Sequence, residues 1–299
     1  MSQSLKRALG ANFCTISWSV VCTGLILCGL CAHGEPNPGA PTPPFGQNAA
    51  AGAFVPVNGI RLYVETYGSG KPVLLIHGNG DSIAGMKNQI AFFSEQYKVI
   101  VADSRGHGKS EMGKGRLTYE QMAEDLNAML EQRSIKSAYV LGWSDGGILG
   151  LLLAIHHPDK VAKLAIMGAN LVPSGAYDWA LQWVERQNRT VDAMLAKGDT
   201  SQRWSTLKQY LDLLGNQPNI PVADLHKITA PTLVMAGDKD VIRTEHTVEI
   251  FENLANAHLC IFPGSTHMIP VQNPELFNRT VAAFFDRPYS RPDTKEFFK

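Results

Sequence analysis

The sequence has little cysteine and no surplus of charge of either sign. Of five cysteines in 299 residues, four lie within the first 31 positions and only Cys260 follows. A lone cysteine cannot form an internal disulfide, so the remainder of the chain is not a disulfide-stapled fold, and we expect Cys260 to be a small core residue. Basic and acidic residues number 27 each, giving zero net charge. Without a basic surplus to neutralise phosphates, we expect no nucleic-acid partner.

Complete nucleotide and metal motifs are also lacking. The stretch "GHGKS" at 106–110 resembles the end of a phosphate-binding loop, but Asp103 stands where that motif needs its first glycine. The stretch "GNGDSI" at 78–83 lacks the third glycine of a dinucleotide fingerprint. His156 and His157 precede Pro158 and suit a helix end better than a metal site. The sequence therefore predicts no cofactor and no metal.

Charge is absent from one long segment near the N-terminus. Lys6 and Arg7 precede residues 8–34, which hold no charged side chain, and Ala32-His33-Gly34 places small residues before Glu35. This pattern is typical of a signal peptide over residues 1–34 and predicts a periplasmic or secreted protein. The alternative is an uncleaved membrane anchor within residues 8–34; otherwise we expect no membrane contact. Residues 35–53 are rich in Pro, Gly and Ala, which is typical of a linker.

Strand-like and helix-like segments alternate from residue 54 to residue 286. A hairpin signal at Asn58-Gly59 comes first, and apolar runs such as "PVLLI" and "TLVMAG" then alternate with segments of helical periodicity. This order predicts an α/β fold with a mostly parallel sheet and helices on both faces. Residues 171–228 interrupt the alternation with an aromatic-rich segment that we expect to be helical. Residues 287–299 form a tail with no predicted role.

A serine, an acid and a histidine follow strand-like runs in that order: Ser144, then Asp238 and Asp240, then His267. The carboxyl ends of parallel strands meet at one edge of a sheet, so these side chains should lie close together. A serine hydroxyl needs a base to remove its proton, and the base needs a third group to orient it. The residues alone leave Asp238 and Asp240 open as the acid.

The chain resembles the α/β-hydrolase superfamily over about residues 54–286. The motifs that carry the resemblance each follow a predicted strand: the His77-Gly78 turn, "DSRGHGKS" at 103–110, "GWSDG" at 142–146, "GDKD" at 237–240 and "GSTHM" at 264–268. The residues flanking Ser144, together with "MGAN" at 167–170, are most similar to the valacyclovir-hydrolase-like group. The resemblance implies the α/β-hydrolase fold, with the segment at about 171–228 as a helical cap over the site.

The resemblance also implies a role for each site residue. Ser144 would attack the carbonyl carbon, His267 would act as base and then acid, and Asp240 would orient His267. Asp238 is the alternative acid, and we expect it to cap the loop instead. The backbone N–H groups of Asn79 and Asp145 would form the oxyanion hole. The implied function is a serine hydrolase of carboxylic esters or related acyl bonds, acting on a small-molecule substrate through an acyl-enzyme.

Several alternatives use the same three residues. The fold does not choose among ester hydrolysis, an aminopeptidase or amino-acid ester hydrolase, a lactonase and a cofactor-free perhydrolase. A non-catalytic ligand-binding protein on this fold is a further alternative. Trp143 and Asp145, which flank the serine, are candidate substrate contacts. Asp145 could pair with a substrate ammonium group, or it could be an acid at a helix start that interacts with the helix dipole.

Overall fold

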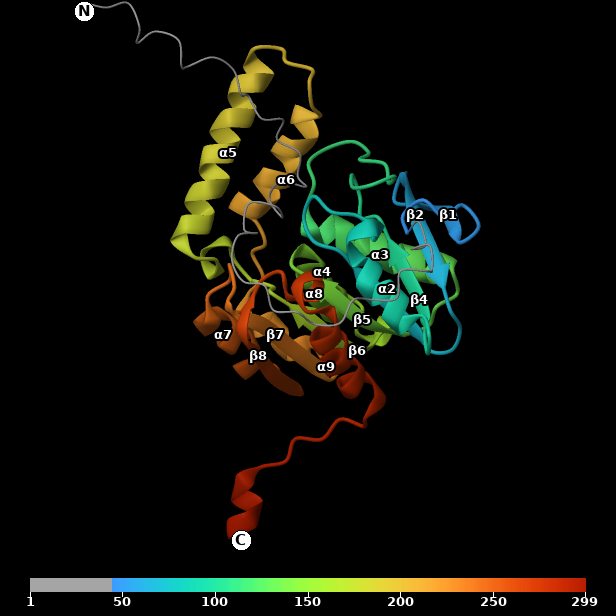
Figure 1. The fold of residues 1–299 in the computed structure, drawn as a ribbon, viewed down its shortest axis with the longest axis vertical. Coiled ribbons are helices and arrows are strands. Elements are labelled where there is room, and N and C mark those ends of the chain that lie inside the picture. The colour runs from blue at the N-terminus through green and yellow to red at the C-terminus, as the bar shows by residue number, and fades with distance from the viewer. Residues whose placement is uncertain (1–44) are drawn as a thin grey trace, which may run out of the picture. The chain divides into compact units, whose positions relative to one another are not determined.

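The computed structural model describes residues 45–299, and within them the strands form one eight-stranded sheet (Figure 1). The strand order is β1-β2-β4-β3-β5-β6-β7-β8; the β1–β2 and β2–β4 pairs are antiparallel and every other neighbouring pair is parallel. This confirms the mostly parallel sheet. The strands are β1 (Gly52–Val57), β2 (Ile60–Tyr67), β3 (Pro72–Ile76), β4 (Lys98–Ala102), β5 (Ala138–Trp143), β6 (Val161–Met167), β7 (Thr232–Lys239) and β8 (Ala257–Thr266).

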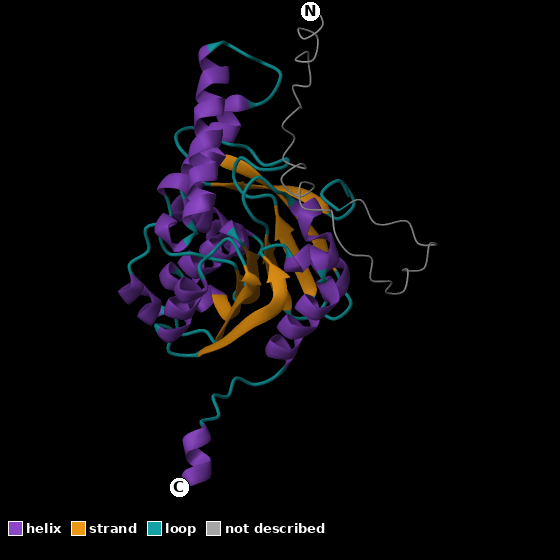
Figure 2. Ribbon diagram, turned by 60° about the vertical axis from the view of Figure 1, so that its left-hand side comes forward, coloured by secondary structure: helices purple, strands orange, loops and turns teal. Residues whose placement is uncertain are grey.

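Helices cover both faces of the sheet (Figure 2). They are α2 (Lys87–Phe93), α3 (Tyr119–Gln132), α4 (Asp145–His156), α5 (Asp178–Ala196), α6 (Trp204–Asn216), α7 (Thr244–Glu252), α8 (Ile269–Gln272) and α9 (Pro274–Asp286). Short 3-10 turns add η1 (Ile83–Met86), η2 (Pro158–Lys160), η3 (Pro173–Gly175), η4 (Val222–Lys227) and η5 (Thr294–Phe298).

Alternation along β5 shows how the two faces are covered. Leu141 belongs to the core cluster that also holds Phe93 of α2 and Phe285 of α9. Its neighbour Val140 lies instead beside Gly150 of α4. Successive side chains of a strand point to opposite faces, so α2 and α9 cover one face and α4 covers the other. Because both faces are buried, the strands read as continuous apolar runs.

Two local sequence patterns correctly predict the elements found in the structure. The β1–β2 hairpin turns at Asn58 and Gly59, whose φ angles of 39° and 78° are both positive, as a two-residue turn between twisted strands requires. Helix α3 begins after Thr118, whose hydroxyl accepts a hydrogen bond from the Gln121 N–H at 3.1 Å. That bond satisfies one of the N–H groups left without partners at a helix start.

The prediction that residues 35–53 form a linker is wrong at the C-terminal end of that range. Gly52 and Ala53 already belong to β1. Ahead of them, the buried Glu65 carboxylate accepts hydrogen bonds from the N–H groups of Gly46 and Asn48 at 2.7 and 3.0 Å. The composition of the segment does not predict this attachment, because the acceptor of these N–H groups is a side chain on β2, which comes later in the chain.

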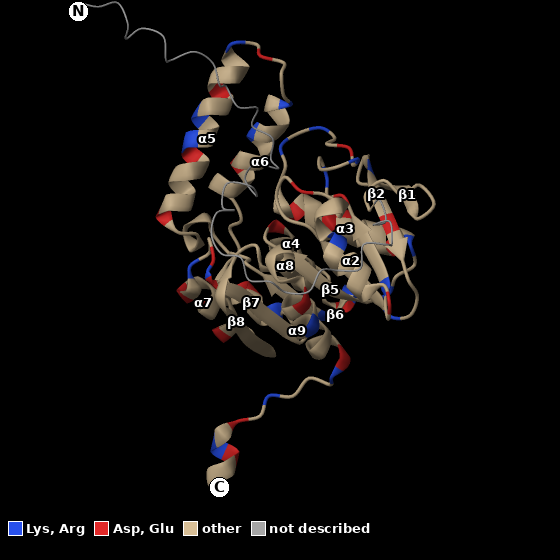
Figure 3. Ribbon diagram, viewed as in Figure 1, with Lys and Arg blue, Asp and Glu red and all other residues tan. Residues whose placement is uncertain are grey.

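The insertion predicted at 171–228 contains α5 and α6, which pack along each other (Figure 1). Helix α6 is fastened to the sheet domain by side chains. Gln209 Oε1 accepts from the Leu117 N–H at 2.7 Å, and the Tyr210 hydroxyl donates to the Gly106 carbonyl at 2.6 Å. Helix α5 carries both signs of charge along its length (Figure 3). The helical character of the insertion is thus as predicted.

The predicted signal peptide over residues 1–34 and the alternative anchor within 8–34 lie outside the described residues. Among residues 45–299, no helix combines the length and the apolar character needed to cross a bilayer. Cys260 lies on β8 partly buried against the core, in keeping with its expected packing role, and burial raises the pKa of its thiol.

Candidate active site

Ser144 occupies a strained turn between β5 and α4. Its φ of 59° and ψ of −122° fall where side chains are rarely found. The glycines around it permit the turn to form: a Cβ at Gly142 would lie 2.0 Å from the Gly146 carbonyl oxygen, and one at Gly146 would lie 2.1 Å from the Ile76 carbonyl oxygen. Strand, turn and helix can therefore approach only with glycine at both positions, as the G-x-S-x-G spacing requires.

His267 and Asp240 form a buried pair at the ends of β8 and β7. The imidazole Nδ1 lies 2.7 Å from Asp240 Oδ1, and Asp240 is 4% exposed. The same carboxylate accepts from the N–H groups of Gly237 and Ile242 at 3.3 and 3.1 Å. Burial favours the neutral acid, but the His267 charge and these hydrogen bonds outweigh it and lower the pKa of Asp240 below its usual value.

The end of β6 brings this pair to the serine turn. The Ser144 N–H donates to the Met167 carbonyl at 2.8 Å. The next residue, Gly168, lies against the imidazole: a Cβ there would be 2.6 Å from both Cε1 and Nδ1 of His267. In addition, the indole N–H of Trp143 donates to the His267 carbonyl at 2.9 Å. These contacts bring the backbone of the serine turn and the His267–Asp240 pair to the same edge of the sheet.

Asp238 plays a different part. Its two carboxylate oxygens accept from the N–H groups of Gly264 and Ser265 at 2.9 and 3.1 Å. It thus closes the turn near the end of β8, as expected for a loop-capping residue, and the carboxylate bonded to His267 is that of Asp240.

The His77-Gly78 turn lies against the serine. A Cβ at Gly78 would be 3.1 Å from Ser144 Cβ. The His77 ring fixes the turn: its Nε2 accepts from the Ser104 N–H at 3.0 Å, so Nδ1 carries the proton and donates to the Gly78 carbonyl at 2.7 Å. Asn79 follows directly. The sequence marked this turn but did not show that its histidine sets the backbone.

Asp145 is the first residue of α4, so its N–H has no partner within the helix and points from the helix start. Its carboxylate is 3% exposed and accepts from Asn79 Nδ2 at 2.8 Å. Burial raises the pKa of Asp145 to about 6, against the smaller opposing effects of Asn79, Tyr119 and the nearby histidines. The carboxylate therefore titrates near neutral pH beside the serine.

The carboxylates of Asp240 and Asp145 both affect the pKa of His267. Burial lowers its pKa, but Asp240 first and Asp145 second outweigh burial, so the pKa of His267 is raised. A histidine whose protonated form is stabilised in this way suits a base that must hold a proton during an acyl transfer.

Trp143, a predicted substrate contact, is 6% exposed and belongs to the core cluster. Its indole N–H donates a hydrogen bond to the carbonyl of His267. Substrate contact by Trp143 or Asp145 stays a prediction.

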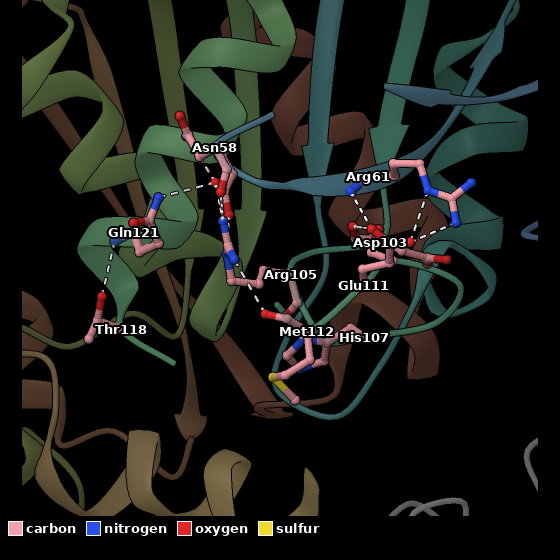
Figure 4. A network of polar contacts seen from close by, with 11 residues as sticks. Asn58, Arg61, Asp103, Arg105, His107, Glu111, Met112, Thr118 and Gln121 are labelled. Carbon is pink, nitrogen blue, oxygen red and sulfur yellow. Dashed lines mark hydrogen bonds and ion pairs between the residues drawn. The ribbon is translucent and has the colours of Figure 1, made fainter. Parts of the chain in front are cut away.

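A buried ion pair braces the "DSRGHGKS" loop (Figure 4). Arg105 Nε and Nη2 donate to the two oxygens of Asp125 at 2.6 and 2.8 Å. Asn58 Nδ2 and Gln121 Nε2 donate to the same carboxylate at 2.9 and 3.2 Å. The loop is thereby tied to the β1–β2 hairpin and to α3, which fixes the backbone that carries His107.

His107 and Tyr210 join the loop to the cap. Their rings stack with centroids 4.2 Å apart and an interplanar angle of 17°. His107 Nδ1 bonds to the Arg105 carbonyl at 2.9 Å, and burial lowers the pKa of His107 to about 3, so the ring is neutral. His107 thus has a structural role in this loop. Nothing in the pattern of an amphipathic helix identifies Tyr210 as the aromatic residue of the insertion that contacts this loop.

Comparison with known proteins places the chain among hydrolases. Residues 71–217 match the family model described as "alpha/beta hydrolase fold". The chain is 26% identical to the serine hydrolase BPHL of Mus musculus, over 82% of this chain and 89% of that protein. It is 28% identical to 3-oxoadipate enol-lactonase 2 of Acinetobacter baylyi, over 76% and 94%.

Solved structures share the fold at low sequence identity. The enol-lactonase from Burkholderia xenovorans superposes with a TM-score of 0.66 at 21% identity, over 79% of this chain and all of that one. A hydrolase from Pseudomonas aeruginosa superposes with a TM-score of 0.68 at 22% identity, over 80% and 100%. The sheet and the serine turn define the α/β-hydrolase fold. The protein is a hydrolase with the α/β-hydrolase fold.

Proposed function

We propose that this hydrolase cleaves a carboxylic ester or a related acyl bond through an acyl-enzyme. The observation that supports the proposal is the 2.7 Å contact between His267 Nδ1 and Asp240 Oδ1. Gly168 lies against the imidazole, and the carbonyl of the preceding Met167 accepts from the Ser144 N–H. A serine, a histidine oriented by an acid, and a turn that exposes the hydroxyl are the parts that nucleophilic acyl transfer needs.

In the first step, Ser144 Oγ attacks the substrate carbonyl carbon while His267 Nε2 takes the hydroxyl proton. Asp240 holds Nδ1–H and stabilises the imidazolium. The negative oxygen of the tetrahedral intermediate accepts from the N–H groups of Asn79 and Asp145. His267 then gives its proton to the leaving oxygen as the ester bond breaks. Water, activated by His267, releases the acid and restores Ser144 in the second half of the reaction.

A fluorophosphonate tests the proposal directly, because Ser144 Oγ would displace fluoride and form a phosphonyl ester of fixed mass. The full chain and a Ser144→Ala variant are treated in parallel, and intact and peptide masses are recorded. We expect one adduct per wild-type chain on the peptide that contains Ser144 and none in the variant. A folded wild-type protein without an adduct, or an adduct on another residue, would overturn the proposal and favour a protein that binds without turnover.

A substrate panel then separates the alternatives that use the same residues. It contains p-nitrophenyl esters with and without an α-amino group, a five-membered lactone, and acetate with hydrogen peroxide for perhydrolysis. The 28% identity with a protein named an enol-lactonase supports including the lactone arm. The Asp145 carboxylate beside Ser144 supports including the amino-ester arm. If Asp145→Asn leaves the preference for aminoacyl over acyl esters unchanged, Asp145 does not bind a substrate ammonium group.

We also propose that the protein is exported, on the strength of the uncharged stretch at 8–34 that follows Lys6 and Arg7. The intact mass of the full chain after expression tests this. Loss of residues 1–34 supports a cleaved signal peptide, whereas retention of the whole segment with membrane-fraction recovery supports the anchor.

A further inference from the structure

We propose that the side chain of Asn79 is a positioning residue, which fixes the oxyanion turn by tying the Asp145 carboxylate to the cap helix α6. The inference rests on the proposed function, since it concerns how the two N–H groups assigned to the oxyanion hole are held.

The contacts of Asn79 carry the inference. Its Nδ2 donates to Asp145 Oδ2 at 2.8 Å and to the backbone carbonyl of Tyr210 at 3.2 Å. One amide group therefore bonds both to the residue after the serine and to the cap. Because Asn79 and Asp145 supply the two proposed oxyanion donors, this bond joins the two halves of the hole through their side chains.

The cap end of this link is itself held by side-chain contacts. Tyr210 donates its hydroxyl to the Gly106 carbonyl at 2.6 Å, and its ring stacks on His107. His107 in turn bonds to the Arg105 carbonyl. The Tyr210 carbonyl is thus held in place by the braced loop below it, and Asn79 meets a fixed acceptor.

The site end of the link is charged and buried. Four groups face the Asp145 carboxylate: Asn79 from the loop after β3, Tyr119 from the start of α3, and the histidines His77 and His267. A buried carboxylate needs donors for its oxygens, and losing one costs more than losing an exposed hydrogen bond. Removing the Asn79 amide should therefore move Asp145, and with it the N–H at the start of α4.

The consequence is a loss of rate with little loss of substrate binding. Oxyanion donors act on the charge that develops in the transition state, so their displacement lowers kcat more than it raises KM. For Asn79→Ala we expect kcat to fall by about 10- to 100-fold, the size expected of a small misplacement of catalytic groups, with KM changed by less than about threefold.

Asn79→Asp gives a readout that a merely structural role would not produce. The new carboxylate has the shape of the amide but repels Asp145 when both are ionised, and the two would share one proton over a raised pH range. When that proton is present, the carboxyl group introduced at position 79 can donate to Asp145 as the amide did. The ratio of variant to wild-type kcat should therefore rise as the pH falls from 8 to 6.

The experiment measures kcat and KM with p-nitrophenyl butyrate between pH 6 and 8 for full-length wild type, Asn79→Ala, Asn79→Asp and the control Asn216→Ala. Asn216 is an exposed asparagine on α6 whose side chain bonds only within its own helix, to the Asp212 carbonyl. We expect the control to match wild type, Asn79→Ala to lose kcat, and Asn79→Asp to recover it toward pH 6.

Two results would overturn the inference: Asn79→Ala with the kcat of the control, or Asn79→Asp with a ratio that does not change with pH. If Asn79→Ala does not fold, the pH profile of the isosteric Asn79→Asp decides. Fluorophosphonate labelling of wild-type Ser144 keeps the two proposals separable. If wild-type Ser144 is labelled and the Asn79 variants keep the kcat of wild type, only this inference is wrong. If the wild-type protein is not labelled, the proposed function is wrong.

Discussion

His267 Nδ1 lies 2.7 Å from Asp240 Oδ1, while the carboxylate of Asp238, two residues earlier, bonds to the N–H groups of Gly264 and Ser265. Two acids in one short loop therefore have separate roles. For Asp240→Asn we expect kcat to fall by about 10⁴-fold, because the amide can no longer orient and stabilise a protonated imidazole.

Asp238→Asn is the matched control for that variant, and we expect its kcat to stay within a few fold of wild type. Steady-state kinetics on p-nitrophenyl butyrate measure both. Equal losses in the two variants would contradict the assignment of Asp240, and would indicate that the loop as a whole had moved.

Ser144→Ala should abolish turnover while the fold persists. Loss of a serine nucleophile lowers kcat by roughly 10⁶-fold in a comparable hydrolase. The thermal unfolding midpoint should stay within a few degrees of wild type, because Ala keeps the Cβ and the turn glycines are untouched. Rates and circular dichroism melts check the two parts. Substantial residual turnover in a pure, folded variant would mean that another residue is the nucleophile.

The pH dependence of kcat/KM should follow His267. The base works only when its imidazole is neutral. Burial lowers the pKa of His267, but Asp240 and, to a lesser degree, Asp145 outweigh it and raise the pKa above 6.5. Activity should therefore rise with pH, with a midpoint above 6.5. In Asp145→Asn the neighbouring negative charge is gone, so this midpoint should move to lower pH. A midpoint that moves upward, or not at all, would contradict the coupling.

Stability at high pH should improve in the same Asp145→Asn variant. Burial raises the pKa of Asp145 from 3.8 to about 6 in the folded state, so folding favours the protonated acid. Its contribution is present below pH 3.8 and is lost as pH rises through 6, where the ionised group opposes folding. Asn carries no charge and can still accept from Asn79.

The gain in stability from Asp145→Asn should accordingly be larger at pH 8 than at pH 5, by about 1 kcal/mol, or a few degrees in the unfolding midpoint. Thermal melts of both proteins at both pH values give the difference directly. An equal gain at the two pH values would show that the ionisation of Asp145 is not linked to folding.

The buried Arg105–Asp125 pair should be sensitive to loss of either partner. Asp125→Ala leaves a guanidinium that is almost fully buried without its carboxylate and also removes the acceptor of Asn58 and Gln121. We expect it to lower the free energy of unfolding by about 3–5 kcal/mol.

The exposed Arg189–Glu185 pair on α5 serves as the comparison for that variant, and Glu185→Ala should change stability by less than about 1 kcal/mol. Chemical denaturation of both variants measures the contrast. Similar small effects would mean that solvent reaches Arg105 once Asp125 is removed.

Much of the fold follows from patterns that are local in the chain. The apolar run of β3, the positive-φ turn at Asn58-Gly59 and the Thr118 cap each depend on a few neighbouring residues, so they can be placed from the sequence. The N-terminal boundary of the folded domain was harder to predict. Residues such as Gly46 look like linker, because their partner is the Glu65 carboxylate on a strand that follows later.

The same distinction between local patterns and long-range contacts applies to the site. The sequence by itself determined the chemical types available at the strand ends: a serine between glycines, a histidine and two acids. Periodicity and order suffice for this, because parallel strands must bring their carboxyl ends to one edge.

Only the tertiary structure decided which acid meets His267, that Trp143 points into the core, and that Asn79 joins Asp145 to the Tyr210 carbonyl. These are contacts between residues up to 131 positions apart in the chain. Their existence depends on side-chain direction and on differences of a few ångströms in backbone placement, and no local pattern encodes either one.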